Sequence, residues 1–306
     1  MKIKISVITI IFFIFINITQ AYENKILFRV NNEIVTSVDI LNEINYLNSL
    51  NEDIKNLQKE KVFQIAKNSL IREKIKEITL LKIFEEIKLD NNDFNKSLMN
   101  SYSNFNINNI DELNQYLKKF SLDIKKIEKK ITINALWNQI IYSRFSKNIK
   151  IDINRLKEDI LKDDKKTEFL LSEIVFNLEI NESLEKKFDL ITKSILQDGF
   201  ENSALIYSVS DSSTNGGNLG WIKESSINKK IKNEISKLEI NEFTSPITIP
   251  GGFLILKLNE TKKTDREIDL DKELEAIIRL KTNDQLNQFS NIFLNKIKKD
   301  IIISEL

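Results

Sequence analysis

The stretch that decides the fold reads YSVSDSSTNGGNLGW and covers residues 207–221. Its glycines, Gly216, Gly217 and Gly220, permit backbone conformations that other residues avoid, which is typical of a tight loop. All six glycines and both prolines of the 306-residue chain lie between residues 199 and 252. Because Gly and Pro interrupt regular structure, we expect a turn-rich α+β domain here, inserted into a helical one.

On both sides of this segment, apolar residues recur at helical spacing. Ile124, Ile127 and Ile131 form one such stripe within residues 37–150, and a long amphipathic helix is predicted over 274–297. A helix at the end of a chain cannot bury its apolar stripe alone. We therefore expect it to return to the N-terminal helices.

The first residues after the N-terminal apolar run predict a β-hairpin. Two short β-prone runs flank an Asn-Asn dipeptide that tolerates positive φ, over residues 26–35. Thr36 then stands as a helix N-cap, with the acid Asp39 three positions on. Residues 301–303 are expected to form a strand near this hairpin.

The composition shifts predict the domain organisation. We expect a signal peptide over 1–21, a helical domain over 22–165, an inserted domain over 166–262 and a C-terminal helix over 263–306. Within the inserted domain we predict strands over 168–178, 243–247 and 252–258, helices over 182–196 and 227–238, and a loop over 208–220.

The N-terminus has the features of a secretory signal. Lys2 and Lys4 precede an apolar run over residues 5–16, and Thr19 and Ala21 offer small residues at a cleavage site. The run is shorter than the ~20 residues that span a bilayer, which favours a cleaved signal over a retained anchor. A chain without Cys suits the oxidising bacterial periplasm.

The composition excludes several classes of function. The chain has no Cys and no His, so thiolate nucleophiles, a His base and sites built on Cys or His ligands are excluded. Lys and Arg total 46 against 45 Asp and Glu, and this net charge of +1 argues against a dedicated nucleic-acid binder. No phosphate-binding glycine motif occurs. We therefore expect no cofactor and no metal.

The 207–221 stretch resembles the signature loop of parvulin-type peptidyl-prolyl isomerases, which runs roughly YS-x-D-x-(S)-x-x-GGDLGW. Two further motifs follow in the family's order. NEFTSPI at 241–247 is similar to G-E-[VIF]-[ST]-x-P-[VI], and GGFLILK at 251–257 is similar to the closing strand G-[YF]-H-I-[IL]. The resemblance covers about 168–262 and implies a parvulin fold there.

The whole layout also resembles the SurA family of periplasmic chaperones. The opening RVNNEIVT at 29–36 is similar to that family, as is the order of signal, helical domain, parvulin domain and returning helix. The resemblance implies an α+β chain whose helical chaperone domain carries an inserted parvulin domain. It also implies a periplasmic protein that binds unfolded outer-membrane or exported proteins, without nucleic acid and without stable membrane insertion once the signal is removed.

The sequence departs from the parvulin pattern at the polar positions. Parvulins carry two histidines on adjacent central strands, and Glu173 and Leu254 stand at these positions here. Asn218 replaces the usual Asp of the glycine loop. Glu173 is therefore the candidate catalytic residue. Two interpretations of Glu173 stay open: its carboxylate faces the pocket and is functional, or it is a solvated or salt-bridged residue of the strand.

The apolar shelf that parvulins offer to the proline ring maps onto Ile227 and Ile231, with Phe253 nearby. Together with Leu254, these are the candidate substrate-binding residues, and the alternative is that they are ordinary core. Leu219 and Trp221 are expected to pin the glycine loop to the domain core.

Rotation about an X–Pro bond crosses a barrier of about 20 kcal/mol but breaks no bond, so a pocket that removes water can accelerate it. The main hypothesis is a chaperone that holds unfolded outer-membrane proteins, with a parvulin-like domain that binds proline-containing peptides and has weak or no isomerase activity. The alternative is an active isomerase for exported proteins, and a third reading is an interaction module in an envelope complex. The client site is expected between the helices of 37–150 and the returning C-terminal helix.

Overall fold

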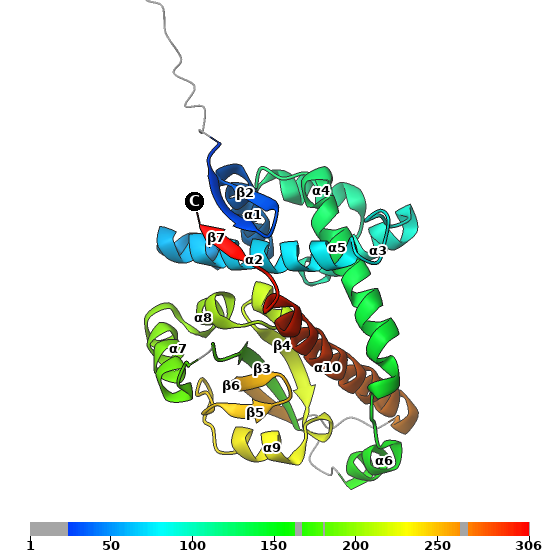
Figure 1. Cartoon of the computed structure of the whole chain (residues 1–306). Coiled ribbons are helices and arrows are strands. Elements are labelled where there is room, and N and C mark those ends of the chain that lie inside the picture. The colour runs from blue at the N-terminus through cyan, green and yellow to red at the C-terminus, as the bar shows by residue number, and fades with distance from the viewer. Residues whose placement is uncertain (1–23, 163–166, 180, 264–268, 306) are drawn as a thin grey trace, which may run out of the picture.

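The computed structural model describes residues 24–162, 167–179, 181–263 and 269–305. The predicted signal peptide lies outside these residues. Figure 1 shows a helical part, built from both ends of the chain, above a part that contains a small sheet.

The N-terminal hairpin forms as predicted. β1 (Ile26–Val30) pairs antiparallel with β2 (Glu33–Thr36), and the turn places Asn31 at φ 52°. Thr36 then caps α1 (Ser37–Leu50), because its hydroxyl accepts from the Asp39 N–H while the Asp39 carboxylate accepts from the Thr36 N–H at 2.8 Å. This reciprocal pair satisfies two donors that a helix start leaves free.

The rest of the N-terminal part is helical. Its elements are η1 (Glu52–Asn56), α2 (Lys59–Leu80), α3 (Asn91–Ser101), η2 (Ser103–Phe105), α4 (Ile110–Lys118), α5 (Ile124–Phe145), η3 (Ser146–Asn148) and α6 (Ile153–Lys162). Fully buried side chains such as Leu47, Leu98, Leu113 and Trp137 form one core across α1 to α5. The helical stripes seen in the sequence are the faces that line this core.

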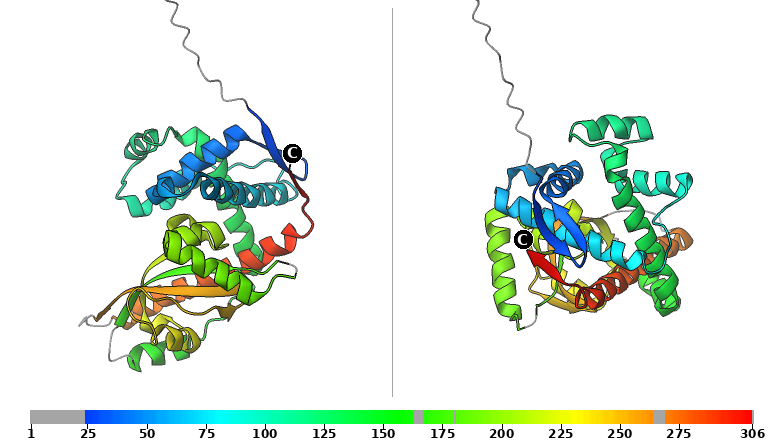
Figure 2. Two further views of the ribbon diagram at one scale, coloured as in Figure 1. Left: turned by 90° about the vertical axis from the view of Figure 1, so that its left-hand side faces the viewer. Right: turned by 45° about the horizontal axis from the view of Figure 1, so that its top comes forward.

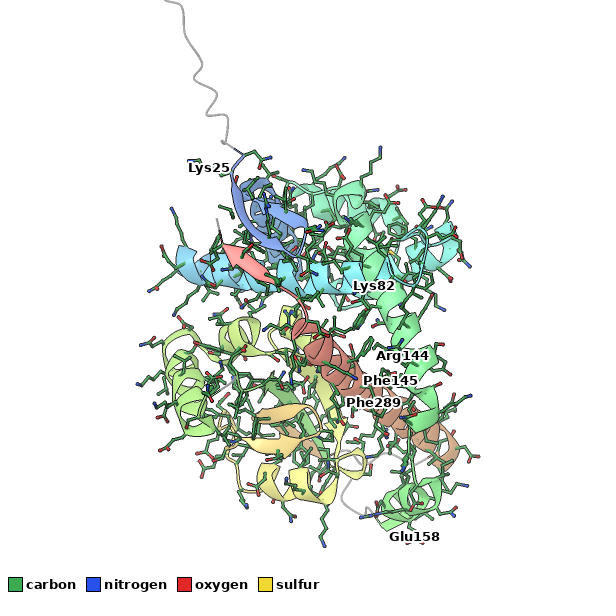
Figure 3. All side chains as sticks on the ribbon, in the orientation of Figure 1. Lys25, Lys82, Arg144, Phe145, Glu158 and Phe289 are labelled. Atoms are coloured by element: carbon green, nitrogen blue, oxygen red, sulfur yellow. The ribbon has the colours of Figure 1, made fainter. Side chains whose placement is uncertain are left out.

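The C-terminal helix returns to this core, as predicted. α10 (Leu270–Lys298) runs beside α5, and β7 (Ile303–Glu305) pairs antiparallel with β1 (Figures 1 and 2). Phe145 and Phe289 stack at 5.2 Å between the two helices (Figure 3). The sheet order β2-β1-β7 therefore joins the two ends of the described chain.

The middle of the chain forms an antiparallel sheet in the order β4-β3-β6-β5. Its elements are β3 (Thr167–Phe176), α7 (Leu184–Asp198), α8 (Phe200–Tyr207), η4 (Asp211–Asn215), β4 (Asn218–Lys223), η5 (Glu224–Ser226), α9 (Lys229–Ile235), β5 (Ile247–Ile249) and β6 (Gly252–Lys263). Phe200 and Ala204 of α8, with Ile191 of α7, pack on one face of the sheet, and Ile235 of α9 packs on the other. The fold is thus a helical domain that carries an inserted α+β domain.

Two predicted elements of the inserted domain differ from the structure, and one helix is additional. The strand expected at 243–247 lies at 247–249 instead, because Pro246 has no N–H to donate to a ladder. The second helix is shorter, because the Asn228 side chain caps it at the Ile231 N–H. Helix α8 within the segment 200–207 was not predicted from the sequence.

No helix among the described residues is both long enough and apolar enough to cross a membrane.

Candidate functional site

Glu173 lies on the central strand β3, on the face of the sheet that α9 covers. Neighbouring strand positions Leu171 and Val175 share this face, as expected for a period of two residues. The Glu173 carboxylate accepts hydrogen bonds from the hydroxyls of Ser210 at 2.6 Å and Ser212 at 2.8 Å. A strand and the serine-rich loop thus build one polar cluster at the edge of an apolar surface.

The cluster places a carboxylate where water is scarce. Burial raises the pKa of Glu173, the two serine hydroxyls oppose this, and the charge of Asp211 adds to it. In the described part of the chain, Glu173 makes no salt bridge, and it is only partly exposed. The Glu173 side chain is thus a half-buried carboxylate held by two serine hydroxyls, and its catalytic role stays a prediction.

The raised pKa sets a pH dependence. A carboxyl that holds its proton more tightly in the folded state than in the unfolded state contributes stability at low pH, and this is lost as pH rises through its folded pKa. Glu173→Gln cannot ionise but keeps an acceptor for both serines. We therefore expect the variant to become progressively more stable than the wild type between pH 4 and pH 8, measured by urea unfolding.

A Glu173→Gln difference that stays flat over this pH range would contradict the raised pKa.

The shelf residues lie around this same face. Leu254 is buried there, and Ile227 and Ile231 are half-buried against the same apolar cluster. Phe253 does not join them: it packs on the opposite face against Phe176, with ring centroids 5.6 Å apart. The expectation that Phe253 lies near the shelf is wrong, because adjacent residues of a strand point to opposite faces.

A cavity of ≈950 Å³ lies beside the shelf, between the inserted domain and helices α6 and α10. Ile227 lines it from one side and Lys281 and Asp284 of α10 from the other. Lys281 Nζ donates to the Ser226 carbonyl at 2.6 Å, which ties α10 to the start of the shelf. Burial raises the pKa of Asp284 to about 6, and the negative charge of Glu173 contributes. Helix α10 therefore forms one wall of the cavity, and its Asp284 lies close enough to Glu173 to sense the charge of that carboxylate.

The glycine loop holds this site by close backbone contact. A Cβ at Gly217 would come 2.1 Å from the Glu173 carbonyl oxygen, and φ there is +76°. The Glu173 N–H donates to the Gly217 carbonyl at 2.8 Å. Leu219 is 36% exposed and does not pin the loop, contrary to expectation. Asn218 instead accepts from the Gly220 N–H at 2.8 Å, which shapes the turn.

Among the residues that the structure describes, no group of three or more Asp or Glu side chains could hold a metal ion. The site presents a carboxylate, two hydroxyls and an apolar wall.

Residues 169–260 match the family model of the rotamase, or PPIC-type peptidyl-prolyl isomerase, domain. This stretch is a parvulin domain. It contains the whole polar cluster, the shelf and the glycine loop, so the resemblance seen in the motifs is confirmed for this part of the chain. The parvulin domain lacks His altogether, because the chain has none.

Curated relatives extend the likeness beyond the parvulin domain. The chain is 26% identical over 145 residues to the chaperone SurA of Pseudomonas fluorescens, which covers 45% of this chain and 34% of that one. It is 36% identical over 63 residues to SurA of Pseudomonas putida, covering 21% and 15%. It is 27% identical over 182 residues to the foldase PrsA of Bacillus subtilis, covering 56% and 59%. The matched part spans less than two thirds of each relative. The chain is SurA-like and carries one parvulin domain.

Solved structures cover more of the chain at lower similarity. A chain of the Campylobacter jejuni SurA-like chaperones PEB4 and Cj1289 covers 92% of this chain at 14% identity, with a TM-score of 0.36. PrsA of Bacillus anthracis covers 76% at 20% identity, with a TM-score of 0.31.

The structure adds residues to the site that sequence reasoning missed. Ser210 and Ser212 lie in a loop without periodicity, so no pattern links them to Glu173. Asp284 is some 110 positions away from Glu173 in the sequence and reaches the site only through the docking of α10. The one available signal was the crowding of hydroxyl residues at 208–214.

Proposed function

We propose that this protein is an ATP-independent periplasmic chaperone that holds unfolded outer-membrane proteins. Its parvulin domain binds proline-containing segments and has weak or no isomerase activity. The observation that carries the proposal is an apolar groove of ≈700 Å³ in the helical domain, lined by Ile44, Ile54, Leu57, Val62 and Phe63 from α1, η1 and α2. The likeness to SurA and PrsA supports it.

The sequence predicts a client site between the helices of 37–150 and the returning C-terminal helix. Between α5 and α10 this contact is packed, since Trp137 stacks on Phe293 at 5.5 Å and its indole N–H donates to the Ser290 hydroxyl at 2.8 Å. We therefore propose the apolar groove of α1, η1 and the start of α2 as the client site.

The groove suits the chemistry of the proposed clients. Strands destined for a β-barrel alternate apolar and polar residues, and the apolar ones stay exposed until the barrel closes. A groove with half-buried Ile44, Val62 and Phe63 can take up such side chains. Preferential binding to the unfolded chain then delays aggregation by mass action and needs no nucleotide.

We expect Phe63→Ser to weaken binding of a urea-denatured, fluorescently labelled outer-membrane barrel protein by about tenfold or more, measured by anisotropy. Aromatic side chains at the centre of a pocket contribute ~2 kcal/mol or more to binding. Leu196→Ser is the matched control, because Leu196 is an apolar side chain that is 77% exposed on α7, outside the groove. Equal affinities for Phe63→Ser and the wild type would contradict the groove as the client site.

The weak or absent isomerase activity follows from the composition of the polar cluster. A carboxylate with a raised pKa replaces one of the two expected histidines, and the apolar Leu254 replaces the other. The shelf formed by Ile227 and Ile231 can still hold a proline ring. The domain is therefore suited to bind a proline-containing chain more than to twist its imide bond.

A further inference from the structure

Two cations of the helical part donate to backbone carbonyls of the parvulin domain. Arg72 of α2 donates from Nη1 to the Ser208 carbonyl at 3.1 Å, and Lys281 of α10 donates from Nζ to the Ser226 carbonyl at 2.6 Å. Both acceptor residues are buried, with 4% of Ser208 and 9% of Ser226 exposed. Hydrogen bonds from a charged donor are stronger than neutral ones, so each contact can fix the stretch of backbone that it reaches.

The carbonyl that Arg72 reaches lies at the start of the serine-rich loop. The Ser208 hydroxyl accepts hydrogen bonds from the N–H groups of Val175 on β3, at 3.0 Å, and of Ser210, at 3.3 Å. The Ser210 hydroxyl in turn donates to the Glu173 carboxylate at 2.6 Å. Arg72 therefore holds the residue from which the loop sets out toward Glu173.

The carbonyl that Lys281 reaches lies directly before the shelf residue Ile227. Ser226 is the last residue of η5, the short turn that leads from β4 to the shelf. At the start of the same turn, Lys223 forms an ion pair with Glu273 of α10. Helix α10 therefore holds both ends of η5, one through its own lysine and the other through its own carboxylate.

The two segments that are held are short, whereas the elements that hold them are long. The turns η4 and η5 cover five and three residues, and short 3₁₀ turns have few hydrogen bonds of their own. Helices α2 and α10 cover 22 and 29 residues, and both contribute to the helical core, through Ile75 and Leu294 among others. Site residues on loops keep their geometry when a rigid element supports them.

We infer that Arg72 and Lys281 are positioning residues of the parvulin site, Arg72 for the serine-rich loop beside Glu173 and Lys281 for the shelf that receives a proline ring. This inference rests on the proposed binding of proline-containing segments by the parvulin domain. It makes the affinity for such segments depend on the docking of the parvulin domain against α2 and α10. A parvulin domain that leaves these helices loses the support of both walls and binds the segments more weakly.

Hydrogen–deuterium exchange of the full chain, read by mass spectrometry, tests each contact separately and needs no peptide. We expect Lys281→Met to speed amide exchange over residues 224–231 by about fivefold or more, because a charged hydrogen bond usually contributes more than this factor to local stability. Arg72→Met should have the same effect over residues 208–217. Each variant should leave the other segment and α5 as they are in the wild type. Lys281→Arg keeps a charged donor and should restore slow exchange.

Lys272→Met is the matched control, because the Lys272 side chain is 85% exposed in the first turn of α10 and pairs with Asp269 at the same helix end. It should change neither segment. The positioning roles are overturned if exchange over the held segment stays unchanged, or if it rises equally in both segments and α5, as a general loss of stability would produce. Lys281 is only half-buried, so its variants decide the inference even where Arg72→Met does not fold.

Peptide affinity separates this inference from the proposed function. For an isotope-labelled, aromatic-rich peptide with one proline, titrated by NMR, we expect the Kd of Lys281→Met to be about fivefold weaker or more and that of Lys281→Arg to match the wild type. Wild-type affinity in Lys281→Met would overturn the positioning role of Lys281. A wild type that leaves the peptide unbound would contradict the proposed function instead, and the exchange experiment would still decide the positioning roles.

Discussion

Trp137→Ala is expected to lower the free energy of unfolding of the helical domain by about 3–5 kcal/mol, the usual cost of truncating a fully buried Trp. Trp137 is 0% exposed at the seam between α5 and α10. The substitution removes the stacking on Phe293 and leaves the Ser290 hydroxyl without its indole donor. Because α10 begins where the parvulin domain ends, loosening this seam frees both the last helix and the strand β7.

The measurement is urea unfolding followed by two signals. The chain has two Trp residues, so Trp221 is the only one left in the variant. Fluorescence then reports the parvulin domain while far-UV circular dichroism reports the helices. We expect the helical transition to move to lower urea by the larger amount. Trp137→Phe keeps an aromatic ring and should lose clearly less stability. Two results would contradict a stabilising role for the α5–α10 contact. One is an equal loss of stability in Trp137→Ala and Trp137→Phe. The other is a fluorescence transition that moves as far as the circular dichroism transition.

Gly217→Ala is expected to destabilise the parvulin domain by about 2–5 kcal/mol. A left-handed conformation costs a residue with a Cβ about 1–2 kcal/mol, and overpacking adds about 1–3 kcal/mol. The new Cβ would meet the Glu173 carbonyl at 2.1 Å, which is inside any permitted contact. Either the loop or the strand β3 must move, and Glu173 then loses its serine partners.

Gly220→Ala separates the cost of the left-handed backbone conformation from the cost of overpacking. Gly220 also has a positive φ, +71°, but a Cβ there meets nothing within 4 Å. Only the conformational cost of about 1–2 kcal/mol should appear. Both glycine substitutions are made in the Trp137→Phe background, so that fluorescence during urea unfolding reports Trp221 alone. If Gly220→Ala lost as much stability as Gly217→Ala, the close approach of loop and strand would not be what requires glycine at 217.

Local patterns predicted the parts of this fold that depend on local physics. The hairpin before α1 follows from β-prone runs around a turn dipeptide, and the Thr36 cap follows from its spacing to Asp39. The return of α10 follows from an apolar stripe too long to leave in water. Strand alternation also predicts that Phe253 and Leu254 face opposite sides of the sheet, because they are neighbours in one strand.

The candidate site was harder to predict from the sequence, because it forms where the serine-rich loop and α10 pack against the parvulin sheet. Glu173 was identified through its position in a motif, but its serine partners depend on the path of the loop through Gly216 and Gly217. Gly251 lets the β5–β6 turn approach α10, because a Cβ at this position would lie 2.9 Å from Ile292 Cγ1. No residue pattern carries such long-range information.

The groove that we propose for clients was equally hard to place from the sequence. The sequence indicated which helices carry apolar stripes, but it could not indicate which of the faces α10 would cover. The aromatic contacts of Trp137, Phe145, Phe289 and Phe293 close the face that seemed available. On the face formed by α1, η1 and α2, an open groove remains beside the half-buried side chains of Val62 and Phe63.

We propose that this protein binds unfolded chains and that its parvulin domain does so without efficient turnover. Exchange NMR on an isotope-labelled, aromatic-rich peptide with one proline tests both parts, with the full chain added in substoichiometric amounts. We predict shift changes that grow with the protein while the cis–trans exchange peaks stay at the uncatalysed rate, which is about 10–100 s per event. Exchange peaks that grow with added protein would show a working isomerase and contradict the claim, as would a peptide spectrum that does not change at all.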